Sequence, residues 1–237
     1  MIIEGALLKI GKKEHLEELI KGNVYFKEAN YFRGYEIDKS KDSREGKIRI
    51  NPNDTAFPED SMLKLISELN IEELNISHAR SGKTPIFCCS VVDENILKKV
   101  SEDEYRLSDE FIKEMTLWGK TLVIISMKEF CDNINKACSK LGIMPLMVRV
   151  LYNQEDNYPN NNDLLEIIRS NKYLAFFHKT KDYKLQNEFR IVIASNTLID
   201  EKSDHYILKI DKLKNAKIFE LEDLSDLQFK SMKQCES

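Results

Sequence analysis

The sequence is poor in glycine and proline, with 8 and 5 residues among 237, and it contains no low-complexity stretch. Long flexible or proline-rich linkers are therefore excluded, and the length fits one large domain or one domain with a small appendage. No hydrophobic run approaches the length of a membrane span, and the first residues lack the basic end and long apolar core of a signal peptide. We therefore expect a cytoplasmic protein without a membrane partner.

Cysteine is also scarce, and its spacing does not match a zinc pattern. The five cysteines occupy positions 88, 89, 131, 138 and 235, so their number is odd and two of them are adjacent. Adjacent thiols cannot easily ligate one tetrahedral ion. We expect reduced, mostly buried thiols and no metal site.

Neither sign of charge predominates. The chain has 36 Lys and Arg against 40 Asp and Glu, a net charge of −4, and the charges are interspersed. A broad basic surface for non-specific duplex binding is therefore not expected. A local basic groove stays open as an interpretation, because Lys179, Lys181, Lys184 and Arg190 fall within one short stretch.

Hydrophobic periodicity and capping residues predict five helices. The strongest follows a capping box formed by Ser126 and Glu129 and ends at Gly142. The five helices are expected over residues 12–21, 60–69, 126–142, 162–170 and 221–233. Residues 35–60 and 153–163 are polar and are predicted to be loops.

Short runs rich in Val, Ile, Phe and Tyr predict seven strands. These are Val24–Phe26, Pro85–Val92, Thr121–Ser126, Leu146–Tyr152, Glu188–Ser195, His205–Ile210 and Ala216–Phe219. The last three leave no room for a crossover helix, which favours antiparallel pairing there. The order predicts an α+β fold, with helices packed around a mainly antiparallel sheet in a single domain over residues 1–220. An amphipathic helix and tail are expected over residues 221–237.

The most informative stretch is the one from Gln186 to Ile193, where a polar loop runs into an apolar strand. Alternating strand residues share a face, so Gln186, Glu188 and Arg190 are expected on one side. The Glu188 carboxylate is suited to hold ribose hydroxyls and to stabilise an oxocarbenium ion. The alternative is a solvent-facing strand edge with an exposed Glu–Arg pair.

An earlier segment contains aromatic residues that can contribute to a ligand site. Around Tyr25 they are interleaved with Arg33, a pattern suited to stacking a planar ring and meeting a phosphate. The alternative is that these aromatic residues belong to the core and rim of a strand. His178 is the histidine nearest the Glu188 motif, and Trp118 is expected to be a packing anchor.

The segment Ser77–Thr84 resembles the end of a P-loop. Its Ser-Gly-Lys-Thr sequence fits, but the position of the first glycine is occupied by Ser77, and Pro85 prevents a following helix. We therefore reject a nucleoside-triphosphatase. Arg80 and Lys83 are retained as candidates for an anion site.

Several landmarks together resemble a bacterial and phage domain family that has no assigned function. They are Tyr25-Phe26, Asp42–Gly46, Cys88-Cys89-Ser90, Trp118, Val148–Tyr152 and Glu188-Phe189-Arg190, spread over roughly residues 23–195. The chain departs from the family pattern at Gln186, which replaces a Glu, and at Leu151, which lies within the V-x-Y strand. The resemblance by itself implies no activity.

More distantly, the late motif resembles the ADP-ribosyltransferase superfamily. That superfamily places an Arg or His on an early strand, a Ser, Thr or Tyr on a middle strand, and Q/E-x-E on a late strand. The resemblance implies that Glu188 is catalytic and holds the nicotinamide ribose, and that Gln186 orients the acceptor. It also implies that Arg33 or Arg80 holds the phosphates of NAD and that Ser90 takes the middle-strand place.

We also expect Tyr25, His178 and Arg190 to contact the nucleotide. The alternative for Arg190 is a structural role, in which it buttresses the loop and Glu188 alone meets the ligand. NAD would then be used to modify a macromolecule, either a protein or a nucleic acid. Small enzymes of this kind often act in phage–host conflict. One rival is a non-catalytic protein that sequesters a nucleotide, or holds a partner protein, in the same cleft. Another is a metal-dependent nuclease that uses Asp182 and Glu188.

Overall fold

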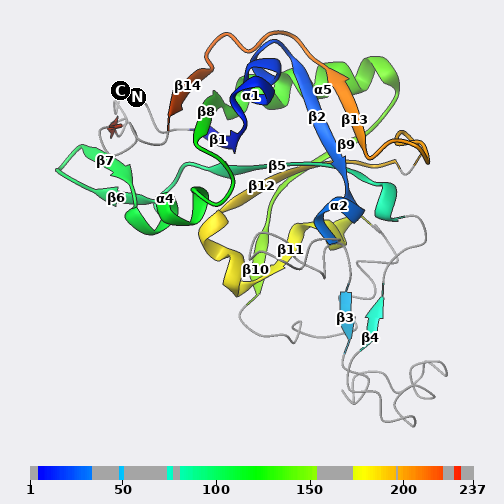
Figure 1. The fold of residues 1–237 in the computed structure, drawn as a ribbon, viewed down its shortest axis with the longest axis horizontal. Coiled ribbons are helices and arrows are strands. Elements are labelled where there is room, and N and C mark those ends of the chain that lie inside the picture. Colours follow the sequence, from blue (N-terminus) through cyan, green and yellow to red (C-terminus); the bar gives the residue numbers. More distant parts are fainter. Residues whose placement is uncertain are drawn as a thin grey trace, which may run out of the picture.

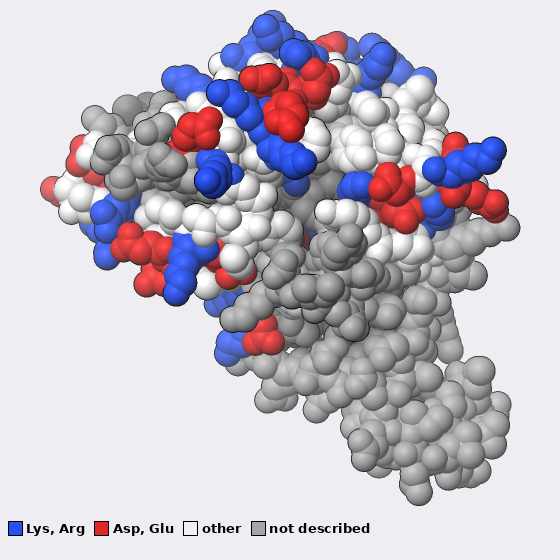
Figure 2. All heavy atoms as spheres, in the orientation of Figure 1, with Lys and Arg blue, Asp and Glu red and all other residues white. Residues whose placement is uncertain are grey.

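The computed structural model describes residues 5–33, 48–50, 74–76, 81–153, 173–195, 197–220 and 227–230, and Figure 1 shows its ribbon. An eight-stranded sheet carries helices on its faces, which confirms the predicted α+β class. In these residues no helix is long and apolar enough to cross a membrane. On the described part of the face drawn in Figure 2, Lys and Arg lie interspersed with Asp and Glu.

The main sheet is built from eight strands that lie far apart in the sequence. These are β1 (Ala6–Gly11), β2 (Asn23–Glu28), β5 (Pro85–Val91), β8 (Thr121–Ser126), β9 (Pro145–Arg149), β12 (Glu188–Ile193), β13 (His205–Lys209) and β14 (Lys217–Glu220). The order is β13-β2-β5-β1-β8-β14, and β12 joins β5 to β9. The described pairings in this sheet are all antiparallel.

Three smaller sheets complete the described strands. They are made of β3 (Ile48–Ile50) with β4 (Leu74–Ile76), β10 (Leu151–Asn153) with β11 (His178–Thr180), and β7 (Glu104–Leu107) between β6 (Leu97–Lys99) and β15 (Phe229–Lys230). Only the pairing of β10 with β11 is parallel among the described strands.

The sheet forks at β5. One edge of β5 pairs with β12, with Ser90 opposite Glu188. The other edge pairs first with β2, where Ile86 lies opposite Lys27, and then with β1, where Ser90 lies opposite Leu8. β1 and β2 therefore diverge along the middle of β5. There the side chain of Lys9 donates a hydrogen bond to the Cys88 carbonyl at 2.7 Å, in place of a neighbouring strand.

One face of the sheet is covered by α1 (Lys13–Ile20) and α5 (Met127–Leu141). Because strand residues alternate between faces, Phe26, Val123 and Phe189 pack there against Phe130 of α5. The opposite face carries two separate clusters. One lies beneath α4 (Asp109–Met115), and the other beneath α2 (Ala29–Arg33) and the 3-10 turn η2 (Leu174–Phe177).

Two of the predicted helices are confirmed together with their ends. α1 stops before Gly22, and α5 ends at Gly142, both of which have positive φ. At the start of α5 the Ser126 hydroxyl accepts from the Glu129 N–H at 3.3 Å. The Glu129 carboxylate does not complete the expected capping box, because it accepts from the Lys214 N–H at 2.7 Å.

Other expectations were wrong. The last three strands of the main sheet do not pair with one another, because β12 joins β5 and β9, β13 joins β2, and β14 joins β8. The prediction of a helix over residues 221–233 was wrong at Phe229 and Lys230. These two residues form β15, because Phe229 is buried in the cluster beneath α4. The loop over residues 35–60 contains β3, and the strand expected over Leu146–Tyr152 is divided into β9 and β10.

β1 and α4 were not predicted at all. The helices expected over residues 60–69 and 162–170 lie outside the described residues.

The turn between α1 and β2 requires glycine. Gly22 has a φ of 99°, and a Cβ there would lie 2.3 Å from the Ile210 carbonyl oxygen. We expect Gly22→Ala to lower the free energy of unfolding by roughly 3 kcal/mol, because it combines a disfavoured φ with a backbone clash. Gly142→Ala is the matched control, since its φ is 65° with nothing within 4 Å. Gly142→Ala should lower the free energy of unfolding by about 1 kcal/mol. Equal losses for the two variants in urea unfolding would contradict the close approach of Gly22 to Ile210.

Candidate functional site

The polar residues Gln186, Glu188 and Arg190 lie at the start of β12, but the backbone there differs from a regular strand. Glu188 and Arg190 lie on β12 as expected, whereas Gln186 ends the 3-10 turn η3 (Lys181–Gln186). Asn187 separates the two with a φ of 44°. Its side-chain amide donates to the Val91 carbonyl and to the Asp93 carboxylate, each at 2.8 Å. These bonds hold the turn, so the expectation that Gln186 continues the strand was wrong.

Lys179 joins the two ends of this turn. Its ammonium donates to Gln186 Oε1 at 2.9 Å and to Glu188 Oε1 at 3.0 Å. Arg190 Nε donates to Glu188 Oε2 at 2.7 Å, and its Nη1 donates to the Phe176 carbonyl. All four side chains of this network, Lys179, Gln186, Glu188 and Arg190, are buried. The motif is therefore not a solvent-facing strand edge.

The network keeps Glu188 ionised. Burial alone would raise the pKa of its carboxyl, but the charges and hydrogen bonds of Arg190 and Lys179 more than offset burial and lower the pKa to about 2. At neutral pH the carboxylate is a fixed hydrogen-bond acceptor and not a proton carrier. Nearby, the Tyr152 hydroxyl accepts from the Glu188 N–H at 2.9 Å, and burial raises the pKa of Tyr152.

A cavity of about 60 Å³ opens beside this network, where β1 leaves β5. Its polar lining comes from Lys9, Ser90, Gln186 and Glu188. Its other lining residues are Leu8 and Ile10 of β1, Cys88 and Cys89 of β5, and Met115 and Trp118 at the end of α4. α4 and η3 lie side by side at this point (Figure 1). The cavity therefore lies at the fork of the sheet.

Three of the candidate residues predicted from the sequence, Ser90, Gln186 and Glu188, line this cavity. Ser90 lies opposite Glu188 in the sheet, and its hydroxyl donates to the Gln186 carbonyl at 2.7 Å. Within the described part of the chain, the buried Nε2 of Gln186 has no hydrogen-bond partner, nor has Nε1 of Trp118. Unpaired buried donors cost free energy, and in native proteins they often mark a place for a ligand or water.

The structure does not bring Tyr25 to this cavity. Tyr25 lies on β2, where its ring stacks on His205 with centroids 4.4 Å apart, and Lys27 lies over its face. His178 lies on β11 beside Lys179 and does not line the cavity; its pKa is lowered by burial. Arg190 is fully buried behind Glu188, so it positions the carboxylate and does not meet a ligand directly.

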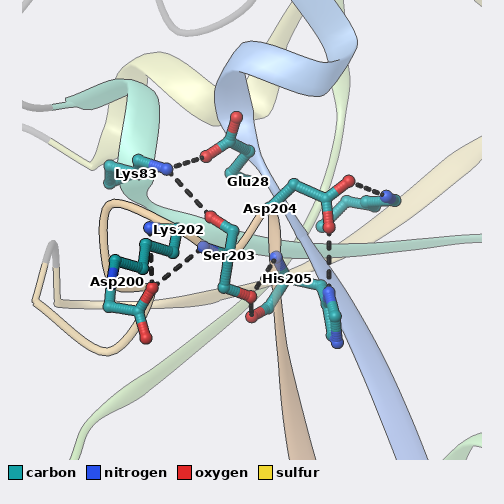
Figure 3. Close-up of polar contacts among 8 residues, drawn as sticks. Glu28, Lys83, Asp200, Lys202, Ser203, Asp204 and His205 are labelled. Atoms are coloured by element: carbon teal, nitrogen blue, oxygen red, sulfur yellow. Dashed lines mark hydrogen bonds and ion pairs between the residues drawn. The ribbon is translucent and has the colours of Figure 1, made fainter.

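The candidate phosphate contacts are only partly described. Arg33 ends α2, but its side chain lies outside the described part of the structure, as does Arg80. Lys83 is engaged elsewhere, as Figure 3 shows: it pairs with Glu28 at 2.8 Å and donates to the Ser203 carbonyl at 2.9 Å. Lys83 therefore holds the Asp200–Asp204 turn against β2, which argues against its use in an anion site.

Among the described residues, none of the cysteines or other carboxylates has the geometry for a further catalytic role. Cys89 is buried, and burial raises the pKa of its thiol, which makes it a poor nucleophile. Among the described residues, no group of three His, Cys, Asp or Glu side chains is placed to hold a metal ion. Asp182 is exposed, while the Glu188 carboxylate is already bound by two cations. This geometry gives the nuclease alternative no ligand set.

Sequence reasoning missed three contributors to the site. Lys179 was noticed only as part of a basic stretch, and Trp118 only as a packing residue. Lys9 carried no signal, because it lies on a strand that was not predicted.

Comparison with protein-family models, with curated proteins and with solved structures found no significant match to this chain. The residues of the cavity are therefore the basis for any functional conclusion.

The buried ion pairs predict a loss of stability in acid. The pKa of Glu188 is about 2 in the folded protein against an ordinary 4.5. Its stabilising contribution is therefore complete above about pH 4.5 and is lost as the pH falls toward 2. From pH 6 to pH 3 we expect this one group to account for roughly 2 kcal/mol of the lost free energy of unfolding, measured with urea.

The Glu188→Gln variant should be less stable than the wild type at pH 6. Its free energy of unfolding should also fall less than that of the wild type between pH 6 and pH 3. The control is Asp132→Asn, which removes the exposed pair with Lys128 and should leave the free energy of unfolding at pH 6 nearly unchanged, because exposed pairs contribute little. An equal acid-induced loss of free energy of unfolding in the wild type and in Glu188→Gln would contradict the low pKa assigned to Glu188.

Proposed function

We propose that the cavity beside Glu188 receives part of the nicotinamide-ribose end of NAD, and that the chain is an ADP-ribosyltransferase-like enzyme acting on a macromolecule. One observation carries this proposal. Ser90, Gln186 and Glu188 come from a middle strand, a turn and a late strand, and they line one cavity. This is the arrangement that the sequence resemblance implies for these three residues.

The chemistry that fits the site is displacement of nicotinamide from the ribose by a nucleophilic group of the macromolecule, which forms a new bond to the same ribose carbon while nicotinamide leaves. As that bond breaks, positive charge develops on the sugar, and a fixed carboxylate beside it lowers the energy of the transition state. Glu188 is ionised and held from both sides, so it needs little reorganisation during the reaction. Each of its oxygens accepts one hydrogen bond from the network and retains a second lone-pair direction for a ligand.

A second candidate function is supported by the same contacts. Lys179 and Arg190 place two positive charges against the single negative charge of Glu188. Those charges weaken the field that would stabilise a cationic sugar. The same cavity can therefore serve a protein that binds a nucleotide and returns it unchanged. The two functions predict the same ligand and different products.

The distinguishing experiment incubates the purified chain with adenine-labelled NAD and a bacterial cell extract. Transfer predicts labelled macromolecules and free nicotinamide. Glu188→Gln should lower labelling by about 100-fold, because a developing charge loses its counterion. The matched control is Leu185→Ala, an exposed residue outside the cavity lining, which should keep full activity.

The outcomes separate the alternatives. NAD that binds in calorimetry and is recovered intact would support the binding protein instead of the transferase. Labelling that is unaffected by Glu188→Gln would exclude Glu188 as the catalytic residue. Absence of any NAD binding would contradict both functions.

A further inference from the structure

The strand β13 forms one border of the main sheet, and its outer edge is open. Among the described strands it pairs only with β2. At one end of this pair the Asp204 carbonyl accepts from the Glu28 N–H at 3.0 Å. At the other end the Ile210 N–H donates to the Gly22 carbonyl at 2.8 Å. In an antiparallel pair such bonded residues alternate with residues whose N–H and C=O groups point away from the partner strand.

This alternation identifies the main-chain groups on the open edge. It directs the N–H and C=O groups of His205, Ile207 and Lys209 away from β2. The groups of His205 are already satisfied, because the Ser203 hydroxyl donates to its carbonyl at 2.9 Å and accepts from its N–H at 3.3 Å. In the described part of the chain no such bond covers the outward groups of Ile207 and Lys209. These two residues therefore offer a template for one more strand.

A groove of about 420 Å³ lies between this edge and α5, which is close to β13 in Figure 1. Its apolar lining includes Leu141 of α5 and Ile207 of β13. These side chains are 58% and 46% exposed, so they are accessible to a partner. Ala137 lies one turn before Leu141 and also lines the groove. Neighbouring exposed apolar side chains beside an open edge favour association with another segment.

The charged lining of the groove is mainly basic. It contains the lysines Lys136, Lys140 and Lys209 and the single carboxylate of Asp211, all exposed. Asp211 accepts from Lys136 at 2.6 Å, whereas Lys140 and Lys209 have no ion pair among the described residues. The groove is therefore complementary to an acidic segment. A second copy of the chain would bring the same lysines to the edge, and like charges placed opposite each other destabilise a pairing.

We infer that the groove between α5 and β13 is a docking site for an extended acidic segment of a partner protein. The main chain of that segment adds a strand to β13 by bonding to Ile207 and Lys209. Its carboxylates meet Lys140 and Lys209, and its apolar side chains cover Ile207 and Leu141. A nucleic acid fits less well, because it has no strand main chain and carries a phosphate on every nucleotide, against two unpaired lysines.

The groove is separate from the cavity beside Glu188, since the two share no lining residue. The inference therefore does not depend on the proposed function, and either can fail without the other.

The first test measures peptide binding to the full chain by fluorescence anisotropy. The probe is a fluorescein-labelled peptide of alternating Glu and Val, and the matched control is a peptide of alternating Lys and Val. The acidic peptide should bind at least about tenfold more tightly, because its charge complements the lysines. Equal affinities, or no binding of the acidic peptide, would overturn the inference. Tighter binding of oligothymidylate than of the acidic peptide would also overturn it, in favour of a nucleic acid.

Two variants test the lysines. Lys140→Glu and Lys209→Glu should each lower the affinity for the acidic peptide about fivefold, because each replaces an attraction by a repulsion. The control is Lys99→Glu, the same change of charge on an exposed residue of β6 outside the groove lining, which should bind as wild type. Thermal unfolding verifies that each variant is folded. An unchanged affinity in the two groove variants, or an equal loss in the control, would overturn the assigned contacts.

Hydrogen exchange tests the added strand without any substitution. With saturating acidic peptide, the amides of Ile207 and Lys209 should exchange at least about tenfold more slowly, because they gain hydrogen bonds. The amides of Tyr206 and Leu208 already face β2 and should change little. Unchanged exchange at Ile207 and Lys209 would overturn the strand addition. A dimer that forms without peptide and protects the same two amides would assign the groove to a second copy and overturn the acidic partner.

Discussion

The site depends on the pairing of one buried carboxylate with two buried cations. A charge in the interior costs several kcal/mol unless it is matched by a partner with good geometry. Glu188 meets Lys179 on one oxygen and Arg190 on the other, and Arg190 is also bound by the Phe176 carbonyl. The network therefore ties η2, β11, η3 and β12 together. It fixes the protonation state of Glu188 and the direction of the Gln186 amide at the same time.

The second constraint is the fork in the sheet at β5. β1 and β2 share one edge of β5 and separate along its middle, where Lys9 supplies a hydrogen bond that a strand would otherwise provide. The face of the sheet opposite α5 is consequently covered by two clusters instead of one. The cavity lies at this fork, against the end of α4, and Ser90 and Glu188, which are paired in the sheet, both line it. Its position is thus a consequence of the topology.

Some of the candidate site could be predicted from the sequence, and some could not. The alternation of Glu188 and Arg190 along a strand is a local pattern and was predicted correctly. Gln186 was misplaced because Asn187 adopts a positive φ, which a two-residue period does not reveal. Lys179 was overlooked because lysine is almost never fully buried unless it is paired, and its partners become evident only in the folded chain.

Signals within the amino-acid sequence were sufficient to predict the elements whose stability is local. α5 was predicted from its apolar period, its Ser126 cap and Gly142, and β8 from a short run of branched residues, because these signals act within a few residues. The neighbours of each strand became evident only in the folded chain, since pairing brings together residues about a hundred positions apart, such as Ser90 and Glu188. The cavity that Ser90 and Glu188 line together exists only because of that pairing.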